Sequence, residues 1–140
     1  MGTITTFDHT ADVGLLVQAG DLDDLFQTAA EGLFDYVVAN RAEVRPVLTE
    51  TFSLNAEGLE ELLVQWLNEL IFRSETRHQV YAWFEARVAE DGRSLTATIQ
   101  GEPIDRERHS LDHEVKAVTR HGLSLERRAD QWVATLVLDI

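Results

Sequence analysis

The 140-residue sequence contains no cysteine, two prolines and a single lysine. Without cysteine the chain forms no disulfide, no thiolate zinc site and no cysteine nucleophile, and we expect a cytoplasmic protein. No apolar run approaches the roughly 20 residues that a membrane helix needs. The first residues also lack the basic and apolar regions of a secretory signal, so we expect no association with a membrane.

Basic residues are scarce as well. Twelve Lys and Arg stand against 25 Asp and Glu, which gives a formal net charge of -13. Because phosphate binding needs clustered basic side chains, the composition argues against autonomous binding of nucleic acid. A basic protein partner or a metal cation suits this charge better. Hydrophobic residues make up 44% of the sequence, enough for a packed core, and the length predicts one domain over residues 1–140.

Hydrophobic spacing predicts the fold class. Apolar residues recur every three or four positions over 22–37, with Asp21 as the N-cap, and again over 59–71, as in amphipathic helices. The rest alternates with period two, which is typical of strands. One strand face would carry Val80, Ala82, Phe84, Ala86 and Val88, and the apolar run 131–140 would be a central strand. We predict an α+β two-layer sandwich with a mainly antiparallel or mixed sheet and two amphipathic helices.

Two acidic segments are the first candidates for a site. Residues 7–14, Phe-Asp-His-Thr-Ala-Asp-Val-Gly, lie between two short predicted strands. Such residues commonly form a turn through side-chain-to-backbone hydrogen bonds, and the alternative is a loop that presents Asp12 or His9 to a ligand. The chain closes on Asp139 and Ile140, whose adjacent carboxyl groups repel each other unless a cation or a donor compensates.

Oxygen ligands favour hard cations such as Ca²⁺ or Mg²⁺. If Asp12 reaches Asp139 and the main-chain carboxyl group of Ile140, three acidic oxygen groups meet at one place. The alternative is an exposed, solvated acidic terminus.

Other polar residues give weaker signals. His109 and His113 have the i,i+4 spacing of a helical metal pair, but their surroundings favour a polar loop with solvated histidines over a zinc site. Lys116 alternates with apolar residues and either extends to solvent from a half-exposed strand or meets a phosphate or the carboxylate cluster. Glu69 and Arg73 are spaced for an ion pair on one side of the second helix.

Five blocks, in this order, resemble the archease family: residues 7–14, Trp66–Phe72, Gly101–Asp105 with His109, Glu114–Gly122 and Leu138–Ile140. The resemblance covers nearly the whole chain. It implies an accessory protein, without a reaction of its own, that serves the RNA ligase of tRNA splicing. Archeases promote guanylylation of the active-site histidine of that ligase and permit multiple turnovers in the joining of tRNA exons.

The resemblance also implies site residues. The divalent-metal site of the family carries over to Asp12, Asp139 and the main-chain carboxyl oxygen of Ile140, with calcium as the expected cation and Mg²⁺ or Mn²⁺ as alternatives. Glu69 and Lys116 match further polar positions of the family and are weaker candidates for acting on the ligase.

Two other functions stay open. Carboxylates on a hard cation could activate water, which would make the protein a small metal-dependent phosphoester hydrolase. Against this, His9 and His121 are the only candidate general bases, and cationic side chains that would assist phosphoryl transfer are few. The third alternative is a structural calcium-binding or chaperone-like interaction module.

Overall fold

The protein is described by a computed structural model that covers residues 2–9 and 12–140. Its elements, in chain order, are β1 (Thr3–His9), β2 (Asp12–Ala19), α1 (Leu22–Val37), the 3-10 helix η1 (Arg41–Glu43), β3 (Leu48–Asn55), α2 (Leu59–Arg77), β4 (Gln79–Val88), β5 (Ser94–Pro103), β6 (Ala117–Arg128) and β7 (Gln131–Asp139). The predicted α+β class, with two helices and antiparallel strands, is confirmed.

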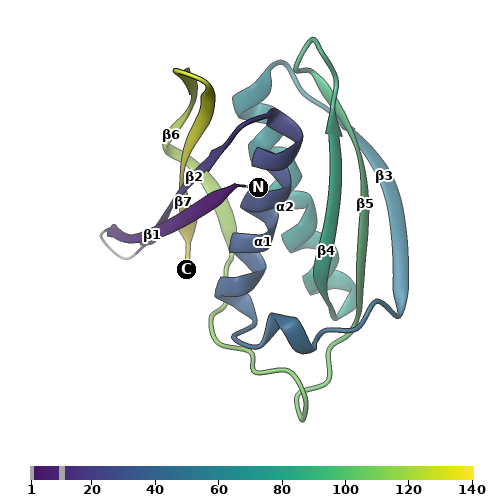
Figure 1. Cartoon of the computed structure of the whole chain (residues 1–140). Coiled ribbons are helices and arrows are strands. Elements are labelled where there is room, and N and C mark those ends of the chain that lie inside the picture. The colour runs from purple at the N-terminus through teal and green to yellow at the C-terminus, as the bar shows by residue number, and fades with distance from the viewer. Residues whose placement is uncertain (1, 10–11) are drawn as a thin grey trace.

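The strands form two sheets, and the helices lie between them (Figure 1). The molecule therefore has three layers, and the predicted two-layer arrangement with one sheet is wrong in that respect, because the strands divide into two sheets that cover opposite sides of the helices. One sheet has the order β1-β2-β7-β6 and the other β3-β5-β4, with every pair antiparallel. As predicted, β7 is a central strand. Both sheets and both helices contribute to the main core cluster. At its centre the buried Trp66 donates from Nε1 to the carbonyl of Phe26 at 2.9 Å, which joins α2 to α1.

Side chains of α1 close the free edge of β4. The helix begins at Asp21, whose side chain accepts from the main-chain N–H of Asp24 at 2.8 Å, as expected for an N-cap. From the same helix, Gln27 accepts from the N–H of Ala86 and Asp23 from that of Val88, at 3.0 and 2.8 Å. Because an uncovered edge would offer these groups to another chain, α1 both packs on the sheet and shields it.

A β-bulge in β4 corrects one prediction. The pairing of β4 with β5 shifts between Tyr81 and Trp83, so that Ala82 is an extra residue. A bulge reverses the in-and-out alternation beyond it, and the predicted single apolar face is therefore wrong. Phe84 and its partners at 86 and 88 pack on the main core, whereas Val80 and Ala82 belong to a small second cluster. Arg41 Nη1 donates to the carbonyl of Ala82 at 2.7 Å.

The segment 104–116 connects the two sheets beneath the ends of both helices (Figure 1). Its main chain pairs with the end of α1 and the residues after it: Ala39 N–H donates to the carbonyl of Ser110 at 2.9 Å, and Asp112 N–H donates to the carbonyl of Val37 at 2.9 Å. The segment then leads into β6, whose antiparallel pairing with β7 places the start of β6 beside the end of β7. In the part of the chain that the structure covers, neither helix is long and apolar enough to span a membrane.

Candidate functional site

The register of the four-stranded sheet brings the two acidic segments together. Asp12 lies directly opposite Asp139 in the β2–β7 pair, and Asp139 lies opposite Ala117 in the β6–β7 pair. Directly opposite residues of an antiparallel pair place their side chains on the same face, with Cβ atoms about 4.5–5.5 Å apart. Carboxylates from the two ends of the chain therefore lie side by side at one end of this sheet.

These carboxylates lie on the outer face of the sheet. Their neighbours Val13 and Leu138, which are opposite each other in the register, point to the core, so Asp12 and Asp139 point away from it. Both residues are half-buried, and Ile140 follows β7 with 39% of its surface exposed. We call the side chains of Asp12 and Asp139 the row. A ligand on the outer face of the sheet can reach the row without disturbing the core.

The structure describes only part of the first candidate segment, residues 7–14. Asp12 is the first residue of β2 rather than a loop residue, and the main chain of His9 pairs with it. Thr10 and Ala11 lie outside the described residues, and the same holds for the side chain of His9. The assignment of a metal to Asp12, Asp139 and Ile140 stays a prediction.

Lys116 lies next to this row. Its main-chain N–H donates to the carbonyl of Asp139 at 2.8 Å, so the residue flanks the end of β7. Its side chain is exposed, and within residues 2–9 and 12–140 it has no ion-pair partner. Lys116 thus offers an exposed ammonium group, without an ion-pair partner among the described residues, on a residue whose main chain is bonded to Asp139, a combination suited to a ligand that carries both phosphate and a metal ion.

Asn68 of α2 holds the start of β6 in place. Its Oδ1 accepts from the N–H of Val118 at 2.8 Å, and its Nδ2 donates to the carbonyl of Val118 at 3.2 Å. Val118 follows Ala117, the residue opposite Asp139. The clamp therefore fixes the strand that carries Lys116 to the site. Sequence reasoning did not single out Asn68, although an Asn within a helix, where its propensity is poor, is a signal for such a contact.

Glu69 belongs to a different group of side chains. Its predicted i,i+4 pair with Arg73 is confirmed, with Oε2 2.7 Å from Nε. Arg73 also stacks over the ring of Phe52 at 4.0 Å and lies 3.6 Å from Glu50, both on β3. The structure therefore ties Glu69 through Arg73 to β3, and Glu69 also lines a hollow with Arg120 of β6. It has no part in the strand pairing that brings Asp12 and Asp139 together. A role for Glu69 on a partner stays a prediction.

The expectation of solvated histidines is wrong for His109, which is only 3% exposed. Its Nδ1 accepts from the N–H of Asp105 at 2.9 Å, which leaves Nε2 as the donor to Glu102 Oε2, also at 2.9 Å. Glu102 pairs with Arg108 and accepts from the N–H of Arg45. Burial raises the pKa of Glu102, but these hydrogen bonds outweigh it, and the net effect is a lowered pKa.

The two histidines do not form a zinc pair, since both nitrogens of His109 are already engaged within the loop. His113 is exposed, as expected, and stacks on Tyr36 with ring centroids 4.1 Å apart. Among the described residues, no group of three or more His, Asp or Glu side chains is arranged to hold a metal ion. A cation at Asp12 and Asp139 would therefore need main-chain oxygens and ligands from outside these side chains.

Comparison with known proteins gives a consistent result. A model of the Archease protein family matches residues 5–140. The chain is 39% identical to Protein archease of Methanopyrus kandleri over 137 residues, which are 95% of this chain and 96% of the relative. It is 36% identical to that of Pyrococcus abyssi, covering 96% of each chain. The solution structure of Methanobacterium thermoautotrophicum protein 1598 matches with a TM-score of 0.80 at 30% identity, covering 98% of both chains.

Proposed function

Because this chain belongs to the archease family, we propose that it is the accessory protein of the RNA ligase that joins tRNA halves in splicing. It promotes guanylylation of the active-site histidine of the ligase and permits the ligase to turn over repeatedly. It has no reaction of its own. The observation that carries the proposal is the pairing of Asp12 with Asp139, which places two acidic side chains on the solvent-facing side of the sheet. Lys116 follows directly beside them, because its N–H donates to Asp139.

The chemistry of this row suits a hard divalent cation. Two adjacent carboxylates on an open face repel each other, and a shared cation would remove that repulsion. Calcium takes about six to eight oxygen ligands, more than two carboxylates supply. Main-chain oxygens of Ile140, water, and phosphate or protein oxygens of the partner would complete the shell, so that the site would bind its cation fully only when docked.

The residues of this chain would then have separate roles. Asp12 and Asp139 would hold the cation, and the ammonium group of Lys116 would pair with a phosphate of the bound nucleotide. Asn68 would hold the start of β6, and with it the preceding Lys116, in its position beside Asp139. A divalent cation bound there would offset the negative charge that develops on the departing pyrophosphate during guanylyl transfer.

A single-turnover guanylylation assay of the cognate ligase, at saturating Mg²⁺ or Mn²⁺, tests this proposal. We expect the wild-type protein to raise the rate, and Asp12→Asn or Asp139→Asn to remove about tenfold or more of that stimulation. Asp130→Asn is the matched control, because Asp130 is an exposed aspartate in the turn between β6 and β7, at the opposite end of β7. This control should stimulate as the wild type does.

Each other outcome has a distinct meaning. If the wild-type protein leaves the rate unchanged, the accessory role is wrong. If both aspartate variants stimulate fully, the metal role of the row is wrong while the accessory role stands. Turnover of simple phosphodiesters by the isolated protein would favour the hydrolase. Calcium-dependent thermal stability with no effect on the ligase would favour the structural module.

A further inference from the structure

A hollow beneath the helices has no part in the proposed chemistry. It has a volume of about 480 Å³ and lies between the ends of α1 and α2 and the segment 104–116, at the lower end of Figure 1. We call it the foot groove. Its apolar surface comes from Val37, Val80, Ile104 and Leu111. Since these residues belong to α1, to β4 and to the segment 104–116, the packing of the whole lower end forms the groove.

The foot groove continues into a narrow slot between the two helices. This slot, of about 90 Å³, is lined by Leu33, Phe34 and Ile71 of the helices and by Val115. It shares Val37, Ser74, Glu75, His113 and Glu114 with the foot groove. A small apolar opening at the base of a wider groove is the shape that receives one anchoring side chain of a partner.

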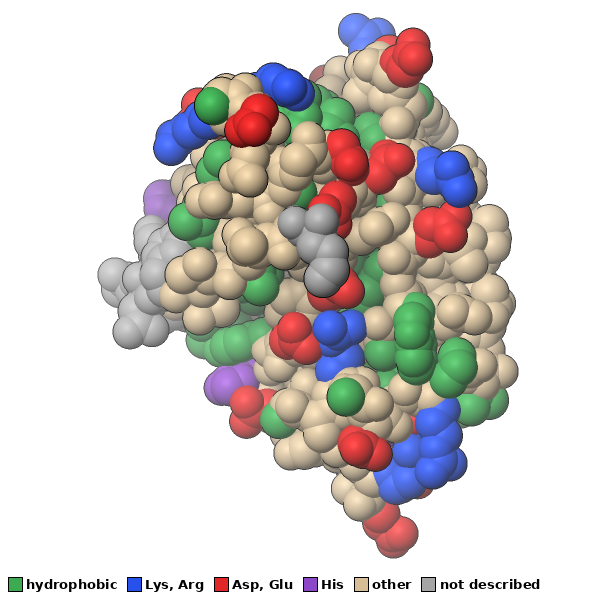
Figure 2. All heavy atoms as spheres, viewed as in Figure 1, with side chains coloured by type: hydrophobic (Ala, Val, Ile, Leu, Met, Phe, Trp, Pro, Cys, Tyr) green, Lys and Arg blue, Asp and Glu red, His purple; other side chains and the backbone are tan. Residues whose placement is uncertain are grey.

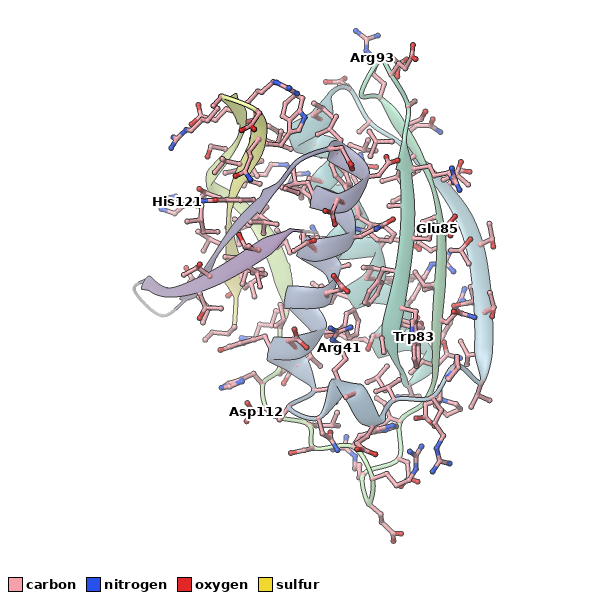
Figure 3. The ribbon with its side chains drawn as sticks, viewed as in Figure 1. Arg41, Trp83, Glu85, Arg93, Asp112 and His121 are labelled. Atoms are coloured by element: carbon pink, nitrogen blue, oxygen red, sulfur yellow. The ribbon has the colours of Figure 1, made fainter. Side chains whose placement is uncertain are left out.

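The rim of the foot groove is acidic. Glu75, Asp112 and Glu114 line it and are exposed, and Figure 3 shows Asp112 at the lower end of the molecule. Within the described part of the chain, neither Glu75 nor Glu114 has an ion-pair partner. Arg106 is the one Lys or Arg among the residues that line the groove. The balance of charge at the rim therefore favours a cationic ligand.

The ends of the helices add to this negative potential. Val37 is the last residue of α1 and His78 is the C-cap of α2, and both line the foot groove. A helix carries partial negative charge at its C-terminus. The last turn of α1 has no basic residue, and Arg77 in the last turn of α2 is paired with Glu50. Neither helix therefore has an unpaired basic side chain in its own last turn.

We propose that the foot groove is the docking site for a segment of the partner protein that carries a basic side chain beside an apolar one. The apolar side chain enters the slot between the helices, and the Lys or Arg pairs with Glu75 and Glu114. This inference rests on the proposed function, because the partner is the RNA ligase. The position of the groove supports it: Glu114 of the groove and Val115 of the slot directly precede Lys116, so a segment bound there would lie close to Asp139.

The test compares two double variants with the same change in net charge. Glu75→Lys with Glu114→Lys reverses the rim of the foot groove. Glu90→Lys with Asp130→Lys is the matched control, since both are exposed residues of hairpin turns at the opposite end of the molecule. Titration calorimetry with the cognate ligase at one fixed ionic strength should show the groove variant binding about thirtyfold more weakly or worse, and the control within about threefold of wild type.

Kinetics separate docking from the chemistry of the row. In the guanylylation assay, the groove variant should need a higher concentration for half-maximal stimulation but reach the wild-type maximum. Variants at Asp12 or Asp139 should lower the maximum instead. Circular dichroism and the Tm of each variant show whether it is folded.

The docking proposal is overturned if the groove variant binds as the wild type does, or if the control loses as much affinity. If either result is found while the wild-type protein still stimulates the ligase, only the docking proposal is overturned and the proposed function stands. If wild-type protein neither binds nor stimulates the ligase, both proposals fall together.

Discussion

Asn68 shows how a single side chain can connect a helix to the edge of a sheet. β6 is the last strand of its sheet, so its outer N–H and C=O groups have no strand partner. The Asn68 amide supplies both the acceptor and the donor that a neighbouring strand would give to Val118. One planar amide thus replaces two ladder bonds at the position next to Ala117, and the strand edge is held without extending the sheet.

Substitutions at Asn68 should separate the two hydrogen bonds. Asn68→Asp keeps the acceptor for the Val118 N–H but loses the donor, and we expect a loss of about 1 kcal/mol in the free energy of unfolding. Asn68→Leu removes both bonds and should cost about 2 kcal/mol or more, because two main-chain groups lose their partner. Urea denaturation measures both, with Asn55→Asp at the exposed end of β3 as the control. If Asn68→Asp and Asn68→Leu are as stable as the control Asn55→Asp, the hydrogen bonds of Asn68 do not contribute to the free energy of unfolding.

At the scale of elements, the segment 104–116 is a part of the fold that hydrophobic patterns in the sequence do not predict. The helices over 22–37 and 59–71 were predictable because each buries one continuous stripe of its own residues. The loop has no period, and its structure depends on contacts with distant elements. His109 is buried because Glu102 on β5 and the main chain of Arg45 lie around it. A histidine among Asp, Arg and Ser residues gives no local sign of that burial.

The candidate site follows the same rule. Asp12 and Asp139 stood out by their type and their neighbours, but their direct opposition depends on the register of β2 with β7, which only the complete sheet determines. Likewise the bulge at Ala82, which turns Trp83 outward and Phe84 inward, has no glycine or proline on β4 itself. Gly101 lies opposite it on β5, where a Cβ would collide with the main chain of Val80, but only the pairing of the two strands connects that glycine with the bulge. Resemblance to a family identified Asp12 and Asp139, and the fold showed that they lie opposite each other and share the outer face of the sheet.

Glu102, which the segment 104–116 holds through Arg108 and His109, makes the free energy of unfolding depend on pH in the acidic range. The pKa of Glu102 is lowered in the folded protein, so the carboxylate stabilises the fold at pH values above the ordinary pKa of a glutamate, about 4.3, and this contribution is lost as the pH falls through the lowered pKa. We expect the free energy of unfolding to fall over that acidic range. Glu102→Gln should lower stability by about 1–3 kcal/mol at neutral pH and weaken the acid dependence.

Thermal unfolding from pH 3 to 7 measures this effect. Glu85→Gln is the control, because Glu85 is an exposed glutamate on the outer face of β4 (Figure 3). If the Glu102 variant shows the same slope against pH as the wild type, the buried carboxylate is not the source of the acid dependence.

At the scale of the whole molecule, charge and shape point the same way. Acidic side chains follow the exposed side of α1, with few basic ones between them (Figure 2). The formal net charge of -13 gives a long-range field that attracts a basic partner before contact. The row of Asp12 and Asp139 and the rim of the foot groove are two acidic structures within that field, and they are connected through the chain, because Glu114 of the rim lies two residues before Lys116, whose N–H donates to Asp139.

Long-range attraction and local docking respond differently to salt. Steering by the net charge is screened beyond a Debye length of about 10 Å at 0.1 M salt and about 3 Å at 1 M. We therefore expect the association rate constant with the ligase to fall about tenfold or more between low salt and 0.5 M, while the dissociation rate constant changes far less. The control double variant at Glu90 and Asp130 should associate more slowly at low salt only, because it alters the field and leaves the foot groove intact. Stopped-flow fluorescence measures both constants; a salt effect confined to dissociation would mean that contacts in the complex, and not the net charge, govern recognition.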